Sequence, residues 1–142
     1  MGRVKLALPE QFIFTTEIPV RISDVNYGGH LGNDSVLSII HEARVRFLTT
    51  HGYSELNVCG AGLIQSDAVI IYKNEAFYGD IIVVEFALSD FSATGCDCFF
   101  RLTRQADGKE IVRAKTGIVF YDYEQKKILR VPAEFKQLAS NI

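Results

Sequence analysis

Residues 26–33 read Asn-Tyr-Gly-Gly-His-Leu-Gly-Asn, a run that combines polar side chains with an accessible backbone. Its three glycines in eight positions suit unusual backbone angles and the close approach of a ligand. Amide groups of such a loop, at the positive end of a following helix, could polarise a carbonyl. His30 could donate a hydrogen bond or titrate near neutral pH. Asn26 could hold a water molecule or the carbonyl, but an amide cannot attack as a carboxylate or usefully accept a proton.

The segment after this loop predicts the helix that such chemistry needs. Any of residues 33–35 could cap it, and Gly52 stands where a helix ending at about Thr50 would stop. Glu42 lies on the flank of the apolar face, where it could act as a general base. That face repeats at helical spacing and consists of Val36, Ile39, Ile40, Ala43 and Phe47.

The rest of the chain predicts an antiparallel sheet. Runs rich in Val, Ile, Phe and Thr, separated by turn-like links, predict strands at residues 12–22, 63–73, 80–90, 95–105 and 110–123. A short helix could follow Pro132. One strand, one long helix and four further strands predict an α+β fold in which the helix lies on a curved antiparallel sheet.

The segment from Arg21 to Arg44 resembles the hotdog thioesterases typified by 4-hydroxybenzoyl-CoA thioesterase and the long-chain acyl-CoA thioesterases. Their pattern is D-x-D-x-x-G-H-V-N-N, followed on the helix by E-x-A-R or E-E-A-R. Residues 71–86 also resemble the family's next two strands and the Gly-Asp turn between them. The positions that match the pattern in type and spacing are Asp24, Gly29, His30, Asn33, Glu42, Ala43 and Arg44.

This resemblance implies a hotdog fold, with one long helix wrapped by a curved antiparallel sheet, in a single domain over residues 1–142. It implies hydrolysis of an acyl-CoA to the free acid and coenzyme A. No cofactor is implied, because coenzyme A is part of the substrate. It also implies a homodimer or homotetramer with the site at the dimer interface.

The chain departs from the family where the second Asp of the pattern is replaced by Asn26. The usual aspartate mechanism therefore cannot be transferred directly, and attention shifts to neighbouring groups. We expect three catalytic residues, Asn26, His30 and Glu42, with Glu42 as the general base. The expected substrate-binding residues are Asp24, Gly28, Gly29 and Asn33.

Structural roles compete with these assignments. Asp24 could bind loop amides or pair with Arg21, and Asn26 could be a turn residue. Asn33 could cap the helix, a role compatible with one in the site. Glu42 could form an ordinary surface pair with the residue four positions later, Arg46.

Two other functions also fit the sequence. A hotdog dehydratase or hydratase acting on a 3-hydroxyacyl or enoyl thioester pairs a loop histidine with a helix carboxylate, as His30 and Glu42 could. A non-catalytic protein that binds acyl thioesters would be consistent with Asn26.

Composition narrows the possible partners. A net charge of −2 and a pI near 5.9 give no basic field for nucleic acid. No segment reads as a signal peptide or a membrane span, so we expect a cytoplasmic protein without membrane attachment. The histidines lack metal-site spacing, so no metal is expected.

Two structural details also concern the sequence. Cys59, Cys96 and Cys98 are expected to be free, buried thiols. Asp67 lies in a predicted strand, and the alternation of side chains alone leaves open whether it faces the helix or solvent.

Overall fold

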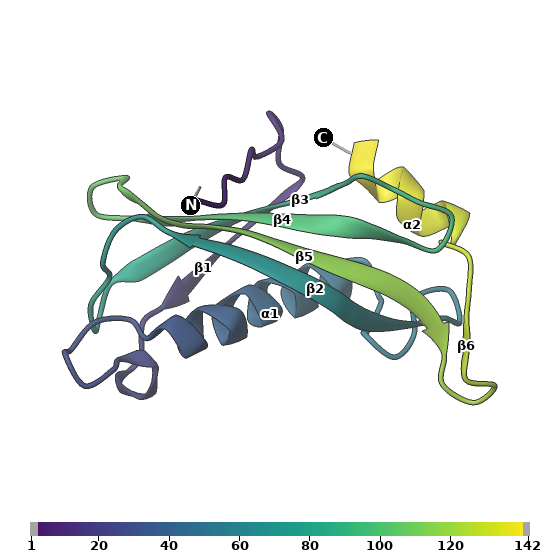
Figure 1. The fold of residues 1–142 in the computed structure, drawn as a ribbon, viewed down its shortest axis with the longest axis horizontal. Coiled ribbons are helices and arrows are strands. Elements are labelled where there is room, and N and C mark those ends of the chain that lie inside the picture. The colour runs from purple at the N-terminus through teal and green to yellow at the C-terminus, as the bar shows by residue number, and fades with distance from the viewer. Residues whose placement is uncertain (1–2, 141–142) are drawn as a thin grey trace.

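The computed structural model describes residues 3–140, in which a long helix lies against a strongly curved sheet (Figure 1). Helix α1 spans Asn33–Thr50, and it follows a short 3₁₀ helix at Ile22–Asp24. The chain ends in helix α2, Ala133–Gln137, and a 3₁₀ turn at Leu138–Ser140. The strands are β1 Phe14–Pro19, β2 Gly62–Tyr72, β3 Ile81–Ser89, β4 Gly95–Arg104, β5 Glu110–Asp122 and β6 Lys127–Ile128.

The sheet is antiparallel throughout, in the order β1-β3-β4-β5-β2, and the short β6 pairs with the end of β5. β3, β4 and β5 follow one another through tight links and form the centre of the sheet. β1 and β2 flank α1 in the sequence but lie at opposite edges of the sheet. Each edge strand therefore lies beside one flank of α1.

The core lies between α1 and the inner face of the sheet. Because side chains alternate along a strand, every second residue of β3, β4 and β5 faces the helix. Phe47 of α1 packs on Phe86 of β3 with ring centroids 4.5 Å apart, and Phe86 packs on Phe100 of β4 at 5.3 Å. The five residues of the apolar stripe predicted for α1 are all buried.

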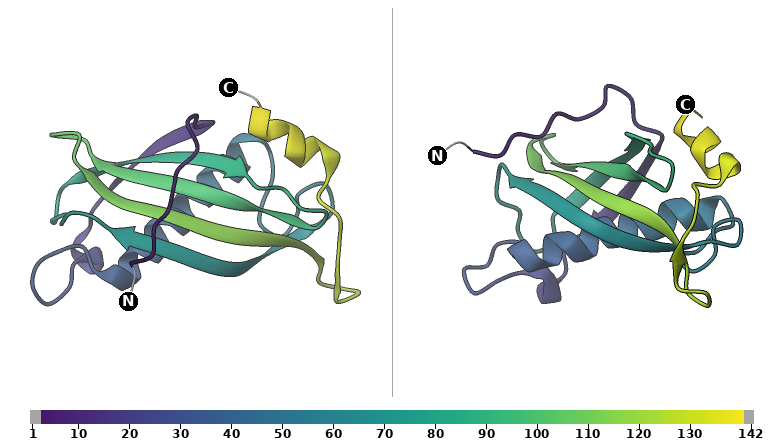
Figure 2. Two further views of the ribbon diagram at one scale, coloured as in Figure 1. Left: turned by 45° about the horizontal axis from the view of Figure 1, so that its top comes forward. Right: turned by 45° about the vertical axis from the view of Figure 1, so that its right-hand side comes forward.

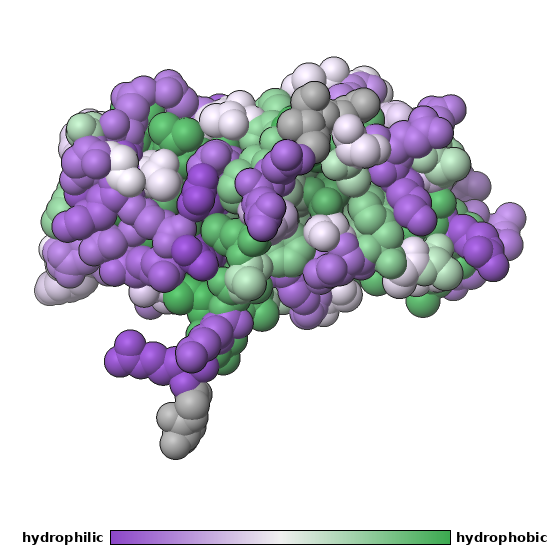
Figure 3. All heavy atoms as spheres, turned by 90° about the horizontal axis from the view of Figure 1, so that it is seen from above, coloured by the Kyte–Doolittle hydropathy of each residue, from purple (hydrophilic) through white to green (hydrophobic). Residues whose placement is uncertain are grey.

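The N-terminal segment crosses the other face of the sheet, as the left view of Figure 2 shows. Arg113 of β5 donates to the Leu6 carbonyl at 3.2 Å, and the Arg101 guanidinium lies 4.9 Å from the centre of the Phe12 ring. Figure 3 looks at the molecule from above, and apolar and charged side chains are mixed over that view.

The predicted strands and helices are confirmed to within one to three residues at their ends. The helix cap differs, because Gly32 is the N-cap and none of residues 33–35 caps with its side chain. The two-residue strand β6 was not predicted, since so short a run has no period of its own.

One further detail differs from the prediction, and the structure also shows the direction of Asp67, which the sequence left open. Cys96 and Cys98 are buried free thiols as predicted, but Cys59 is exposed on a loop. Burial raises the pKa of the Cys98 thiol to about 12. A β-bulge at Ser66 reverses the alternation of β2, so Asp67 faces away from α1 and binds Lys115 at 2.6 Å.

None of the helices within residues 3–140 is long and apolar enough to cross a membrane.

Candidate active site

The Asn26 side chain organises the glycine-rich loop. Its Oδ1 accepts hydrogen bonds from the backbone amides of Gly28 at 3.0 Å and His30 at 3.2 Å. Its backbone amide donates to the His30 carbonyl at 2.7 Å, and its carbonyl accepts from the Gly29 amide at 3.0 Å. Gly29 has a φ of 82°, a value that glycine adopts without strain. The loop is therefore a compact turn built around one amide side chain.

The segment between β2 and β3 holds this loop in place. The Leu31 amide donates to the Ala76 carbonyl at 2.7 Å. The His30 ring meets Phe77 edge-on, with centroids 5.1 Å apart. His30 Nδ1 lies 3.5 Å from a carboxylate oxygen of Glu75. The Nδ1 edge of the ring therefore faces Glu75, and Nε2 is left for another partner.

The N-terminus of α1 begins directly after the loop. Gly32 has no side chain with which to cap it, and its own amide donates to the Asp24 carbonyl at 2.8 Å. A Cβ at this position would come within 2.7 Å of an Asp34 carboxylate oxygen, which is the end of an exposed side chain that can move away. The backbone amides of Asn33 and Asp34 have no hydrogen-bond partner among residues 3–140. Two free donors and the positive end of the helix dipole thus lie beside the loop.

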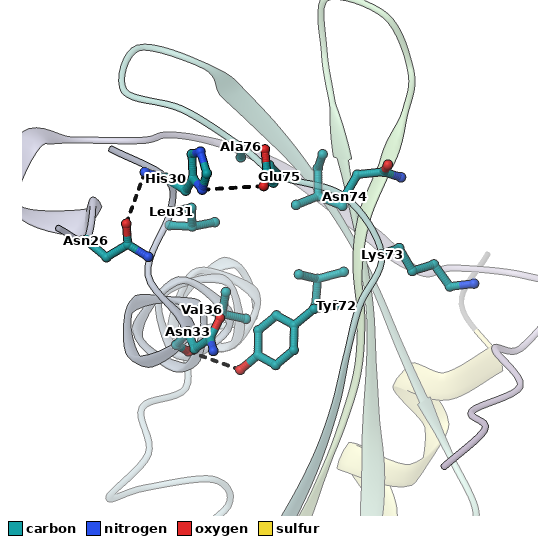
Figure 4. A pocket seen from close by; sticks show the side chains of 12 residues that line it. Asn26, His30, Leu31, Asn33, Val36, Tyr72, Lys73, Asn74, Glu75 and Ala76 are labelled. Carbon is teal, nitrogen blue, oxygen red and sulfur yellow. Dashed lines mark hydrogen bonds and ion pairs between the residues drawn. The ribbon is translucent and has the colours of Figure 1, made fainter. Parts of the chain in front are cut away.

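A pocket of about 260 Å³ opens between this loop, the start of α1 and the end of β2 (Figure 4). His30 and Glu75 lie together on one side of it, and Tyr72 reaches across to donate to the Asn33 carbonyl at 3.3 Å. Its walls combine polar and apolar side chains. The lining residues are Asn26, His30, Leu31, Asn33, Val36, Tyr72, Lys73, Asn74, Glu75, Ala76, Ile111 and Val112.

The structure brings together only some of the residues that the sequence suggested. Asn26, His30 and Asn33 line the pocket. Gly28 and Gly29 shape the loop beside it, and neither is among the lining residues.

Asp24 and Glu42 lie elsewhere, in a separate hollow between α1 and β1. Asp24 is buried and accepts hydrogen bonds from the Arg21 amide at 2.9 Å and the Arg21 Nε at 3.3 Å. Glu42 pairs with Arg46 at 2.8 Å, and Arg46 in turn donates to the Glu17 carbonyl of β1. Within one chain, neither carboxylate reaches the pocket that contains His30, and both form the structural contacts considered as alternatives.

Sequence reasoning missed Tyr72 and Glu75 as members of the site. Both lie in the segment 71–86 that carried the second part of the family resemblance. A usable signal was the polar run from Lys73 to Glu75 directly after an apolar strand, because polar residues at a strand end commonly serve a site.

Among residues 3–140, no group of three or more His, Cys, Asp or Glu side chains is arranged to hold a metal ion.

Comparison with solved structures identifies similar folds. A 1,4-dihydroxy-2-naphthoyl-CoA thioesterase from Synechocystis superposes with a TM-score of 0.82 at 22% identity, covering 91% of this chain and 96% of that one. A DHNA-CoA thioesterase from Staphylococcus aureus gives 0.78 at 17% identity, covering 89% and 87%. A hypothetical protein from S. aureus, solved in complex with CoA, gives 0.77 at 17% identity, covering 94% and 85%.

These likenesses establish the hotdog fold expected from the sequence. No curated protein sequence matches the chain. The family model of the thioesterase-like superfamily matches residues 20–138, which include the loop, α1 and all the strands of the sheet except β1. The chain therefore belongs to the thioesterase-like superfamily.

Proposed function

We propose that this protein is an acyl-CoA thioesterase, which hydrolyses an acyl-CoA to a free acid and coenzyme A. The observation that carries the proposal is the placement of the loop around Asn26 and the uncapped N-terminus of α1 on one pocket. The similar structures named as CoA thioesterases, and one solved with CoA, support the same substrate class.

The pocket supplies the groups that polarise a thioester carbonyl. The free amides of Asn33 and Asp34 are donors at the positive end of a helix, where charge on a developing oxyanion is stabilised. His30 lines the same pocket with Nδ1 toward Glu75, which leaves Nε2 of the neutral ring to accept a hydrogen bond. Removing one such donor typically costs roughly 10²- to 10³-fold in turnover.

The apolar part of the pocket lining suits the acyl chain. Val36, Ile111 and Val112 line it, so carbon atoms of the acyl group would replace water against an apolar wall. The leaving group needs little help, because a thiol leaves readily near neutral pH. The remaining requirement is a group that takes a proton from the attacking water.

A measurement of free thiol released from a panel of acyl-CoAs tests the proposal, with hydration of crotonyl-CoA followed in parallel. We expect thiol release and no hydration. Hydration without thiol release would instead identify a hydratase, and binding without either reaction would identify an acyl-thioester binding protein.

The loop can be tested directly through Gly29. Gly29→Val should lower thiol release roughly 10²-fold, because a β-branched residue cannot hold a φ of 82° and the loop amides would turn away. Gly52→Val is the matched control, since Gly52 has a φ of 77° at the far end of α1 and also has open space around its Cβ position. Equal activity of both variants would remove the loop from the site.

A further inference from the structure

Tyr72, the last residue of β2, forms one wall of the pocket. It pairs with Val112 of β5, so both side chains leave the sheet on the face that carries α1. The Tyr72 hydroxyl donates to the Asn33 carbonyl at 3.3 Å. The ring therefore spans the space between the end of β2 and the first turn of α1, as Figure 4 shows.

Tyr72 is the large ring at the pocket that the core does not hold in place. Val36, Ile111 and Val112 supply the aliphatic part of the lining, and each of them is only 1% exposed. Their positions are fixed, because a close-packed interior leaves a buried side chain no empty space to turn into. Tyr72 is 49% exposed. The size of the pocket therefore depends on the ring of Tyr72 more than on its aliphatic wall.

The hydrogen bond of the Tyr72 hydroxyl is weak. Its length of 3.3 Å exceeds the usual O–H···O distance of about 2.7–2.8 Å. The Asn33 carbonyl is also the acceptor that an α-helix uses for the amide four residues later, so the hydroxyl only shares it. The bulk of the ring, and not its hydroxyl, is therefore what closes this side of the pocket.

α1 and β2 run beside each other in opposite directions. The start of α1 contacts the end of β2 through Asn33 and Tyr72, whereas Arg44, later in the helix, contacts Gln65 near the start of the strand at 3.2 Å. A helix rises about 1.5 Å per residue and a strand about 3.3 Å. Four residues of α1 therefore cover about the same distance as two residues of β2.

This geometry places Leu37 of α1 beside Ile70 of β2, on the far side of the Tyr72 ring. Leu37 follows Asn33 by one helical turn, and Ile70 precedes Tyr72 by two strand residues, so each shares a face with the residue named. Leu37 is 42% exposed and Ile70 is half-buried, and neither lines the pocket. A long hydrocarbon chain would find apolar surface there, but it would first have to pass the ring.

The volume of the pocket suits a small acyl group. At about 260 Å³, it lies below the roughly 300–1,000 Å³ of most small-molecule sites. With roughly 30 Å³ for each water-sized group, this volume holds on the order of nine non-hydrogen atoms. A hexanoyl or a benzoyl group stays within that limit, whereas a decanoyl group exceeds it.

We propose that the ring of Tyr72 sets the upper size of the acyl group, so that the protein hydrolyses short-chain or single-ring acyl-CoAs and excludes longer chains. This inference rests on the thioesterase function proposed above and names the substrate class of the same pocket. The thioester carbonyl would lie at the amides of Asn33 and Asp34, with the acyl group packed between Val36 and the ring of Tyr72.

A purely structural role of Tyr72 leads to a different expectation. If the ring only attached the end of β2 to α1, its removal would lower the activity on every acyl-CoA by the same factor. If the ring limits size, its removal changes the ratio of kcat/KM between a long and a short substrate. Because both substrates are measured on one protein sample, this ratio does not depend on how much of a variant is folded.

Thiol release from acetyl-, butanoyl-, hexanoyl-, decanoyl- and benzoyl-CoA tests the proposal. For the parent we expect kcat/KM for decanoyl-CoA to lie roughly 10²-fold or more below that for hexanoyl-CoA, because the additional methylene groups do not fit. Tyr72→Ala should raise the ratio of decanoyl- to hexanoyl-CoA hydrolysis roughly tenfold or more, since the chain can then reach Leu37 and Ile70.

Two further variants serve as controls. Tyr72→Phe keeps the ring and lacks only the weakly bonded hydroxyl, so the ratio should stay within about threefold of the parent's. Tyr78→Ala removes another exposed tyrosine, which follows β2 and does not line the pocket, and it should leave the ratio unchanged.

The outcomes separate this inference from the proposed function. If the parent releases no thiol from any of the acyl-CoAs, the proposed function fails and the size limit fails with it. If the parent is active but hydrolyses decanoyl-CoA as well as hexanoyl-CoA, the pocket does not limit the acyl group. A Tyr72→Ala variant that loses the same factor on every substrate would show a structural role. A Tyr72→Phe variant that accepts decanoyl-CoA as well as Tyr72→Ala does would overturn the assignment to the ring.

Discussion

At the scale of single residues, the main finding is that Asn26 acts as an organiser of backbone amides. Its Oδ1 accepts from two amides of the loop, which a carboxylate could also do. The sequence predicted that Asn26, His30 and Asn33 belong to one site, and they do line one pocket. It left open whether Asp24 and Glu42 face the site or form local pairs, and the structure shows the local pairs with Arg21 and Arg46.

Variants of Asn26 distinguish an organising role from a direct one. Asn26→Ala removes the acceptor of two amide hydrogen bonds and should lower kcat/KM roughly 10²-fold. Asn26→Asp keeps both acceptors and should remain closer to the parent. Steady-state kinetics on a confirmed acyl-CoA provide the comparison. Equal impairment of the two variants would show that the amide nitrogen, not the loop geometry, is what matters.

Glu42 provides a second prediction at this scale. Its side chain is 51% exposed and pairs with Arg46 one helical turn away, so Glu42→Gln should change turnover less than about threefold. Its effect on the free energy of unfolding should be about 0.5 kcal/mol or less. A loss of roughly 10²-fold in turnover would instead establish Glu42 as the general base suggested by the sequence.

At the scale of the elements, α1 is attached to the sheet by two kinds of contact. Its apolar stripe was predictable from a period of 3.6 residues and is buried as expected. The Arg44 attachment was not predictable, because a buried arginine depends here on Glu55 in the loop after α1 and on Gln65 near the start of β2. Gly32 was missed as the N-cap because it caps without a side chain, whereas the sequence offered polar candidates at residues 33–35.

The Arg44 attachment predicts how stability depends on pH. Partial burial alone would raise the pKa of Glu55, but the hydrogen bonds and charges of His41 and Arg44 outweigh that effect and hold the pKa below its ordinary value of 4.5. The ionised carboxylate therefore stabilises the fold above that pH. The contribution is lost as the pH falls through the lowered pKa. Glu55→Gln should therefore lower the free energy of unfolding by about 1–2 kcal/mol at pH 7, with a smaller difference near pH 3.

Urea unfolding of the parent and of Glu55→Gln at both pH values, at one fixed protein concentration, measures this difference. A difference of the same size at pH 7 and pH 3 would mean that Glu55 stabilises the chain through packing and not through its charge.

At the scale of the whole molecule, the two edges of the sheet are unequal. β2 is long and unprotected, whereas β1 is short and carries a proline and a charge. The family resemblance of the sequence implied self-association. Which edge is used depends on the order of the strands in the sheet. That order places β1 and β2, which are consecutive strands along the chain, at opposite edges.

Lysine substitutions at the two edges test this asymmetry. Ala68→Lys, at the exposed middle of β2, would bring two like charges together where two β2 edges pair and should shift the oligomer toward monomer. Thr15→Lys at the exposed edge of β1 is the control and should leave the assembly unchanged. Sedimentation at micromolar concentration reports both. A parent that sediments only as a monomer of 15.9 kDa would contradict self-association.

The bulge at Ser66 also limits how the length of β2 can vary. Gln65 pairs with Ile118 and Asp67 with Gly117, so Ser66 is an extra residue between two halves of opposite alternation. Deleting Ser66 would restore unbroken alternation of side chains between the two faces of β2. One half of the strand would then be turned over relative to the other. Either Gln65 would leave Arg44, or Asp67 would turn from Lys115 toward the helix. β2 can therefore accept many substitutions but no insertion or deletion, and changes in chain length are confined to the loops on either side of it.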